Sequence, residues 1–426
     1  MTSILLLPVY FLLVLSLFYF LTKNKIIDLS FKHAAAIFTI KLILGCIYGY
    51  LFLKFYNGDD TWLYHRQSLQ EYQTLSHHPW QFIKALFSHS YDKSQAITFF
   101  DTTNNYWKDL QYNILIKLLA VFNILSSGNY YINVLFFNLL TFWGHYFFYK
   151  LFINYFPQKR ATAFVIIFLF LPFIFWESGI RKDGLAFIGL SGCLFYFVEY
   201  SEHKRIDHLV KAALYFALLV LVRNFVALSL IPVLLAFWSC KYFKAQALYI
   251  FSIYTLSFAA LFFLSSLGPN AFNLPQKMAE RQEAFQHLEG GSYMFVPQLV
   301  GTFSSYTNVL PYAINHTFFR PYITEGKSPL LLFAAVETAF ILIVIIAALV
   351  QIKKLKTITK HPLLMLLLFL ALINYLMIGY TVPFAGAIVR YRIFFEVMLL
   401  LPMFIICDSH NTLENWLNKR LHLYSY

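Results

Sequence analysis

The sequence predicts an all-helical, polytopic membrane protein, and three observations predict this class. Hydrophobic residues make up 59% of the 426 positions. Charged residues make up only 12%, against roughly 25% in soluble domains. Apolar stretches of about 20 residues, enough to cross hydrocarbon, recur along the chain. We therefore expect a single transmembrane domain over residues 1–426, with about 11 membrane-spanning helices.

Taken in order, the expected spans are residues 3–22, 34–55, 130–155, 162–176, 184–199, 210–222, 225–240, 246–266, 329–351, 362–381 and 393–407. The first span has no basic residue before it and no small-residue cleavage site after it. It therefore predicts a retained helix, because a signal peptide needs both features.

Basic residues are concentrated in alternate linkers, and this distribution predicts the orientation of the chain in the membrane. Sixteen Lys and Arg residues lie in one set of linkers, at residues 23–33, 157–161, 200–211, 241–245, 352–361 and after 408. The short linkers of the other set hold five. Because basic loops stay on the cytoplasmic side, we expect a multi-pass protein of the cell (inner) membrane. Its N-terminus lies outside and its C-terminus inside.

Two long segments, residues 56–129 and 267–328, are then extracytoplasmic loops. Amphipathic stretches within them, at residues 80–88 and 276–288, predict helices that lie at the membrane interface. A third stretch, residues 111–127, is apolar but short and contains Lys117. We expect it to lie on the outer surface or to dip into the bilayer.

Composition and motifs exclude several classes of function. The net charge of +13 is scattered through short linkers and includes no basic run beside aromatic residues, which excludes nucleic-acid binding. P-loop, dinucleotide-binding, HExxH and nucleophile-elbow motifs are missing. We expect no cofactor and no set of metal ligands. A divalent ion that bridges carboxylates to a phosphate stays open as an alternative.

Charges embedded in or beside the spans collect at the face opposite the basic linkers. A charged side chain costs roughly 2.5–3.5 kcal/mol at mid-bilayer, so such residues usually mark a functional site. One extracytoplasmic site is predicted from ten of them: Asp59, Asp60, Glu177, Arg181, Lys182, Asp183, Arg223, Arg320, Arg390 and Arg392.

The first motif is NGDDTWLY, residues 57–64, directly after the second span. Gly58 lets the chain turn out of the membrane, and one of the two aspartates is expected to cap a following helix. The other is a candidate general base, because a carboxylate at the membrane edge can deprotonate a sugar hydroxyl. Our choice for the base is Asp60, with Asp59 beside the turn glycine as the cap.

The second motif is WESGIRKDG, residues 176–184, a tight turn between two spans. Glu177 and Arg181 are four residues apart and would pair if this segment were helical. Arg181 and Lys182 at a helix N-terminus would alternatively bind phosphate, since backbone N–H groups add positive potential there. Asp183 is expected to support the site.

The remaining arginines, Arg223, Arg320, Arg390 and Arg392, precede or divide spans on the outer side. Each could reach lipid headgroups, but four on this face oppose the usual charge bias. A guanidinium binds phosphate bidentately, which favours a pyrophosphate clamp. Arg392 and Glu396 are four residues apart and are expected to pair. Glu337, inside the ninth span, is expected to pair with one of the arginines.

Three stretches resemble bacterial multi-spanning exopolysaccharide and O-antigen polymerases of the EpsG-like and Wzy-like kind. They are GDD with Tyr64 at 58–64, IRKDGLA at 180–186 and VRYR at 389–392. More distantly, the chain resembles the GT-C class of lipid-linked-sugar glycosyltransferases. Arg223 departs from the pattern, because EpsG-like proteins tend to have a histidine there.

That resemblance implies glycosyl transfer from a polyprenyl-(pyro)phosphate-linked sugar to a glycan acceptor at the extracytoplasmic membrane face. Asp59 or Asp60 would be the base, and the arginines would hold the pyrophosphate. The alternative is a transporter or flippase for a similar lipid-linked glycan. It would need polar residues along a path through the mid-bilayer, where the spans are mainly apolar apart from Lys41. The oligomeric state stays open.

Overall fold

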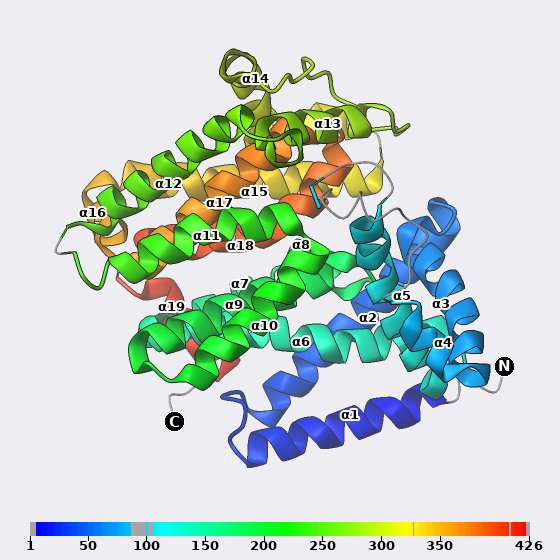
Figure 1. Cartoon of the computed structure of the whole chain (residues 1–426). Helices are drawn as coiled ribbons and strands as arrows, with labels where there is room; N and C mark the ends of the chain where they lie inside the picture. Colours follow the sequence, from blue (N-terminus) through cyan, green and yellow to red (C-terminus); the bar gives the residue numbers. More distant parts are fainter. Residues whose placement is uncertain are drawn as a thin grey trace. The chain divides into compact units, whose positions relative to one another are not determined.

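The computed structural model of the chain describes residues 6–86, 99–100, 105–243, 245–326, 328–408 and 410–422. These residues form helices joined mainly by short turns, and a longer non-helical segment, residues 287–302, joins α13 to α14 (Figure 1). The helices group into two compact units. The first unit comprises Met1–Ala96, Asn104–Leu151 and Ile167–Arg223, and the second comprises Ile97–Thr103, Phe152–Ile166 and Asn224–Tyr426.

The helices of the first unit are α1 (Leu6–Lys23), α2 (Phe31–Phe55), α3 (Asp59–His77), α4 (Pro79–Lys84), α5 (Tyr106–Ser126), most of α6 (Tyr130–Tyr155), α8 (Leu171–Ser178), α9 (Lys182–His203) and α10 (Ile206–Val222). Those of the second unit are most of α7 (Arg160–Phe168), α11 (Asn224–Ser239), α12 (Ala247–Leu264), α13 (Leu274–Gln286), α14 (Phe303–Ile314), η6 (Asn315–Phe319), α15 (Pro329–Val350), α16 (Ile352–Lys360), α17 (Pro362–Thr381), α18 (Ala385–Cys407) and α19 (Thr412–Leu421).

The predicted class of a helical, multi-pass membrane protein is confirmed. Six described helices are long and apolar enough to cross a membrane, and up to nine spans result if each of three bent pairs counts as one. The number eleven stays a prediction. Ten of the expected spans each overlap one of the helices above, whereas the expected span 162–176 is divided between α7 and α8. The expected division of residues 210–240 falls between α10 and α11.

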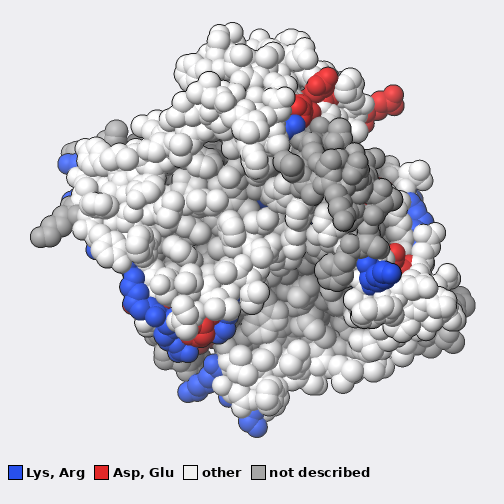
Figure 2. Space-filling view, in the orientation of Figure 1, with Lys and Arg blue, Asp and Glu red and all other residues white. Residues whose placement is uncertain are grey.

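The apolar helices differ in how much of their surface the protein itself covers. The apolar windows of α1 and α12 are 17% buried, whereas that of α9 is 72% buried. The protein itself therefore leaves most of the apolar surface of α1 and α12 uncovered, whereas α9 lies in a protein core. Figure 2 agrees: most of the described surface is white, and charged residues gather in a few groups.

The first unit contains a sharp bend between α5 and α6. Their axes differ by 117°, and the chain turns at Ser127 and Gly128, whose φ angles are +50° and +75°. The expected surface stretch 111–127 lies within α5, which packs on α3. Lys117 of α5 is buried there and pairs with Glu71 at 2.7 Å.

Other expected interfacial helices are recovered in part. Residues 79–84 form α4, and residues 87 and 88 of the expected stretch lie outside the described residues. In the second unit, α13 covers most of the expected stretch 276–288. Gln282 ties α13 to its neighbours, because its carbonyl accepts from Leu299 N at 2.7 Å while its amide donates to Tyr380 O at 2.9 Å.

Candidate functional site

The acid pair, Asp59 and Asp60, lies where α2 has ended and α3 begins. Asn57, Gly58 and Asp59 have consecutive positive φ angles of +51°, +90° and +43°. This left-handed run suits glycine and asparagine and is tolerated by aspartate. Gly58 is the N-cap of α3 and makes no side-chain cap bond. The expectation that an aspartate caps the helix is therefore wrong: Asp59 and Asp60 lie in its first turn, where the helix dipole favours negative charge.

Both carboxylates of the pair contact one guanidinium. Arg181 Nη1 donates to Asp59 Oδ2 at 3.0 Å, and Arg181 Nη2 donates to Asp60 Oδ2 at 2.8 Å. The arginine side chain is 2% exposed, whereas those of Asp59 and Asp60 are 34% and 46% exposed. A buried cation thus fixes two carboxylates that still face solvent.

Protein groups surround the Arg181 guanidinium. Besides the acid pair, it donates to the Tyr48 hydroxyl and lies 3.9 Å from Asp183 Oδ2. Asp183, in the first turn of α9, also pairs with Arg223. These contacts change the predicted phosphate-binding role of Arg181 and Arg223. In the structure they neutralise carboxylates, and Arg181 supplies positive charge at the centre of three aspartates.

Lys182 lies on the aromatic side of the same cluster. Its Nζ is 5.9 Å from the ring centre of Tyr64 and 5.1 Å from that of Tyr112, a range in which a cation is attracted to the ring face. Burial, followed by the nearby Asp60 carboxylate, raises the pKa of the Tyr64 phenol. Lys182, Tyr64 and Asp60 therefore share one neighbourhood.

Tyr48 is a site residue that the sequence analysis missed. It lies inside the apolar α2, fully buried, with no charge or motif to mark it. Its ring reaches the cluster because Gly179 has no side chain: a Cβ there would come 2.6 Å from the Tyr48 ring. Close backbone approach of this kind is the usual reason for a glycine in a packed turn.

Glu177 does not pair with Arg181, since α8 ends at Ser178 and the next residues are not helical. It belongs instead to a second set of buried polar residues. Lys41 of α2, His145 of α6 and Glu177 of α8 are each 0% exposed. Lys41 interacts electrostatically with both other residues. Among the described residues, Lys41 Nζ, His145 Nε2 and both Glu177 oxygens have no hydrogen-bond partner.

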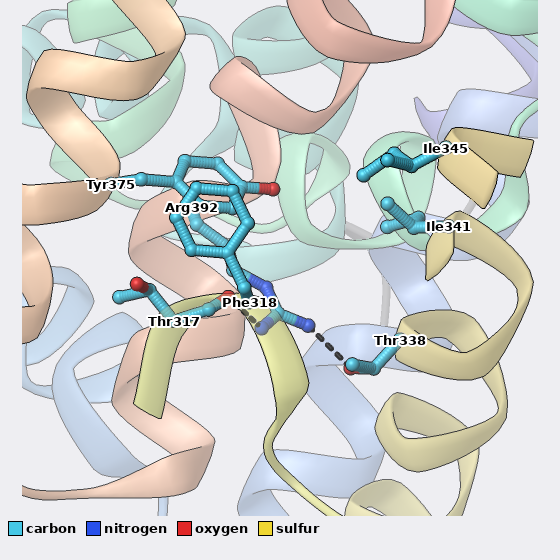
Figure 3. Close-up of a pocket in the computed structure, with 7 residues that line it drawn as sticks. All are labelled: Thr317, Phe318, Thr338, Ile341, Ile345, Tyr375 and Arg392. Carbon is cyan, nitrogen blue, oxygen red and sulfur yellow. Dashed lines mark hydrogen bonds between the residues drawn. The ribbon is translucent and has the colours of Figure 1, made fainter. Parts of the chain in front are cut away.

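In the second unit, Arg392 is held entirely by protein groups. The predicted pair with Glu396 is confirmed, with Nε 2.5 Å from Oε1. Nη1 donates to the carbonyls of Thr317 at 2.6 Å and Arg320 at 2.9 Å, and Nη2 donates to Thr338 Oγ1 at 2.5 Å. Figure 3 shows this guanidinium beside a small pocket. In this arrangement Arg392 has a structural role.

The other candidates of the second unit are more exposed. Arg320 Nε donates to both carboxyl oxygens of Glu325, at 2.9 and 3.1 Å, and Arg320 Nη2 donates to Oε1. This pair lowers the pKa of the Glu325 carboxyl. Arg390 Nη2 donates to the Tyr391 hydroxyl at 2.8 Å. Glu337, in contrast, is buried, at 4% exposed. The expected pair with an arginine is not found among the described residues: Glu337 interacts electrostatically with Arg392 and Glu396, but neither of its oxygens has a hydrogen-bond partner.

The structure thus brings six predicted site residues together in the first unit: Asp59, Asp60, Arg181, Lys182, Asp183 and Arg223. Arg320, Arg390, Arg392 and Glu337 belong to the second unit. One site that combines both sets stays a prediction. Over the described ranges, no three His, Cys, Asp or Glu side chains are grouped as a metal site requires.

His65 gives the first unit a predictable response to acid. It is buried edge-on against the stacked rings of Trp62 and Tyr130. Burial, followed by Arg66, lowers its pKa to about 4. An unfolded histidine titrates near ~6.5. As pH falls from about 6.5 to about 4, the unfolded chain therefore binds a proton that the folded chain does not bind, and the free energy of unfolding falls.

We expect the thermal unfolding midpoint of the purified protein to drop between pH 7 and 4.5 by more in the wild type than in His65→Gln. Glutamine keeps a polar side chain but cannot titrate. Parallel pH profiles for the two proteins would contradict this assignment.

Comparison of the chain with protein-family models, with curated proteins and with solved structures found no match.

Proposed function

We propose that the protein is a membrane glycosyltransferase or polysaccharide polymerase that uses a polyprenyl-(pyro)phosphate-linked sugar donor at the extracytoplasmic membrane face. One observation carries the proposal. Two half-exposed carboxylates stand at the end of an apolar helix, held in place by an arginine that is itself buried. An acceptor hydroxyl at the membrane edge can reach these carboxylates without leaving the lipid-water boundary.

In the proposed reaction, the Asp60 carboxylate accepts the proton of the acceptor hydroxyl. The hydroxyl oxygen forms a bond to the anomeric carbon of the donor sugar. The bond from that carbon to the phosphate oxygen breaks, the electron pair stays on the phosphate oxygen, and polyprenyl (pyro)phosphate leaves. Arg181 donates one charge-assisted hydrogen bond to Asp60 and one to Asp59, which fixes both carboxylates and lowers the cost of orientation.

The leaving group needs positive charge as the phosphate bond breaks. In the first unit, Lys182 is half-buried on the same side as Tyr64, and we assign it to the phosphate. Arg181 and Arg223 act as positioning residues, because their contacts are with Asp59, Asp60 and Asp183. The aromatic faces of Tyr64 and Tyr112 offer a surface for the sugar.

The phosphate-binding roles predicted for Arg320 and Arg390 can be tested separately. If their planar forks bind phosphate, we expect Arg320→Lys and Arg390→Lys to lower turnover at least tenfold, since an ammonium cannot bind bidentately. Glu325→Gln is the matched control, because it removes the partner of Arg320 and keeps the fork. Wild-type turnover of both Lys variants would assign these arginines to lipid headgroups.

The proposed topology has eleven crossings, the N-terminus outside and the C-terminus inside, supported by the distribution of linker charge. With Cys46, Cys193, Cys240 and Cys407 replaced by alanine, we expect cysteines at Ser76 and Ser292 to react with an impermeant maleimide from outside intact cells. A cysteine at Lys204 should react only after lysis. Labelling of Ser76 and Ser292 only from the cytoplasm would remove the extracytoplasmic site.

Cells that lack the protein provide the test of function. We expect them to lose a surface glycan and to accumulate its polyprenyl-linked precursor, and expect both changes to be reversed by the wild-type gene. Unchanged glycan and precursor levels would contradict the proposal.

A second candidate function is a transporter or flippase for a lipid-linked glycan. The buried set of Lys41, His145 and Glu177 favours it, because titratable residues within a helix bundle are common along transport paths. The side of the membrane on which the precursor accumulates separates the two functions. An enzyme deficiency leaves precursor on the outer leaflet, and a flippase deficiency leaves it on the inner leaflet.

A further inference from the structure

Two buried carboxyls and one guanidinium meet in the second unit. Glu337 of α15 is 4% exposed, Glu396 of α18 is 0% exposed and Arg392 of α18 is 1% exposed. Glu337 interacts electrostatically with both residues of α18, and Tyr375 of α17 interacts with all three. If both carboxyls and the guanidinium were ionised and Tyr375 were neutral, this buried cluster would carry one uncompensated negative charge.

The hydrogen bonds do not supply the missing compensation. Glu396 Oε1 accepts from Arg392 Nε. Glu396 Oε2 and both oxygens of Glu337 have no hydrogen-bond partner among the described residues. Arg392 Nη1 and Nη2 donate to neutral acceptors, namely two carbonyls and the Thr338 hydroxyl. A lone carboxylate in such an environment is strongly disfavoured unless it is neutralised.

We propose that Glu337 and Glu396 form a proton-binding site, in which the two carboxyls share one proton beside Arg392. Two adjacent buried carboxyls cannot both ionise without mutual repulsion, and one proton removes it. A proton also needs no further ligands, and no cluster of three His, Cys, Asp or Glu side chains surrounds the pair in the described part of the chain.

A small pocket lies next to the cluster. It is lined by Thr317, Thr338, Tyr375, Arg392 and three apolar side chains. Figure 3 shows the Tyr375 hydroxyl and the Arg392 guanidinium on its wall. Glu337 and Glu396 do not line this pocket, so the pocket meets the cluster at Arg392 and Tyr375.

The proton has a structural consequence for the neighbouring turn. Arg392 links Glu396 to the carbonyls of Thr317 and Arg320 at the end of η6. When the pair loses its proton, the second negative charge competes for the same guanidinium. Protonation therefore favours the arrangement in which Arg392 holds this turn. The inference does not depend on the proposed function.

The test uses the whole purified protein in lipid nanodiscs, with thermal unfolding measured from pH 5.5 to 8.5. Unfolded glutamates titrate near ~4.3, so the unfolded chain has lost a proton that the folded chain keeps, and stability falls as pH rises. We expect about a tenfold loss in the folding equilibrium per pH unit for one proton. In Glu337→Gln this loss disappears, because the amide is neutral at every pH.

Glu283→Gln is the matched control: it makes the same substitution at an exposed glutamate of α13, and its pH profile should parallel that of the wild type. A Glu337→Gln profile that also parallels the wild type would overturn the proposal. So would a Glu337→Gln protein that fails to fold, since an amide should replace a protonated acid. Replacing choline with sodium at fixed ionic strength should change nothing. A stabilisation by sodium that Glu337→Gln abolishes would show a metal-cation site instead.

Discussion

Asp60→Asn is expected to lower turnover by the ~10²–10⁴-fold typical of a lost general base. The amide still accepts a hydrogen bond from Arg181, so the variant should fold and insert, but it cannot take the proton of the acceptor. We propose Asp60 as the base because its side chain is 46% exposed, compared with 34% for Asp59. The measurement is glycan formed and precursor accumulated at equal protein level.

Asp59→Asn is the matched comparison. Asparagine tolerates the left-handed backbone that Asp59 adopts, with φ +43°, and its carbonyl can accept from Arg181 Nη1. We expect turnover to fall by no more than about tenfold, which is far smaller than the loss expected for a general base. Normal output from both single variants and from the double variant would exclude a catalytic role for this pair.

Replacing Arg181 is expected to have the second-largest effect. Arg181→Met would leave the carboxylates of Asp59, Asp60 and Asp183 without their shared cation. Removal of one partner from a wholly buried pair costs about 3–5 kcal/mol; here we expect about 2–3 kcal/mol, because two of the aspartates remain half exposed to solvent. The unfolding midpoint of the purified protein measures the loss.

Arg181→Lys separates charge from geometry at the same position. Lysine keeps the positive charge but cannot contact two carboxylates through a planar fork. We expect smaller destabilisation than in Arg181→Met, together with at least a tenfold loss of turnover. Tyr48→Phe removes a single hydroxyl next to the guanidinium and should destabilise the protein less than either Arg181 variant. Full activity of Arg181→Lys would show that the fork does not position the acid pair.

Features that depend on nearby residues were predicted well from the sequence. The apolar stretches coincide with helices, and the break at Arg223 was marked by a charge between two apolar runs. Arg392 and Glu396 pair as their spacing on one helix predicts. Hydrophobic length and helical spacing are local properties, so the sequence displays them directly.

Features that depend on tertiary contacts were predicted less well. The contact between Arg181 and the acid pair joins residues more than a hundred positions apart, and no spacing rule encodes it. The expectation that an aspartate caps α3 failed because the helix begins one residue earlier than such a cap would allow. Tyr48 was missed because an aromatic residue in an apolar helix resembles any other core residue.

The most direct test of the central claim uses purified protein reconstituted into vesicles with lipid-linked oligosaccharide from cells that lack the protein. We expect wild-type protein to form longer glycan and to release polyprenyl (pyro)phosphate, and expect Asp60→Asn to form neither at a comparable rate. Movement of intact donor across the bilayer, with no glycosidic bond formed or broken, would contradict the account and identify a transporter.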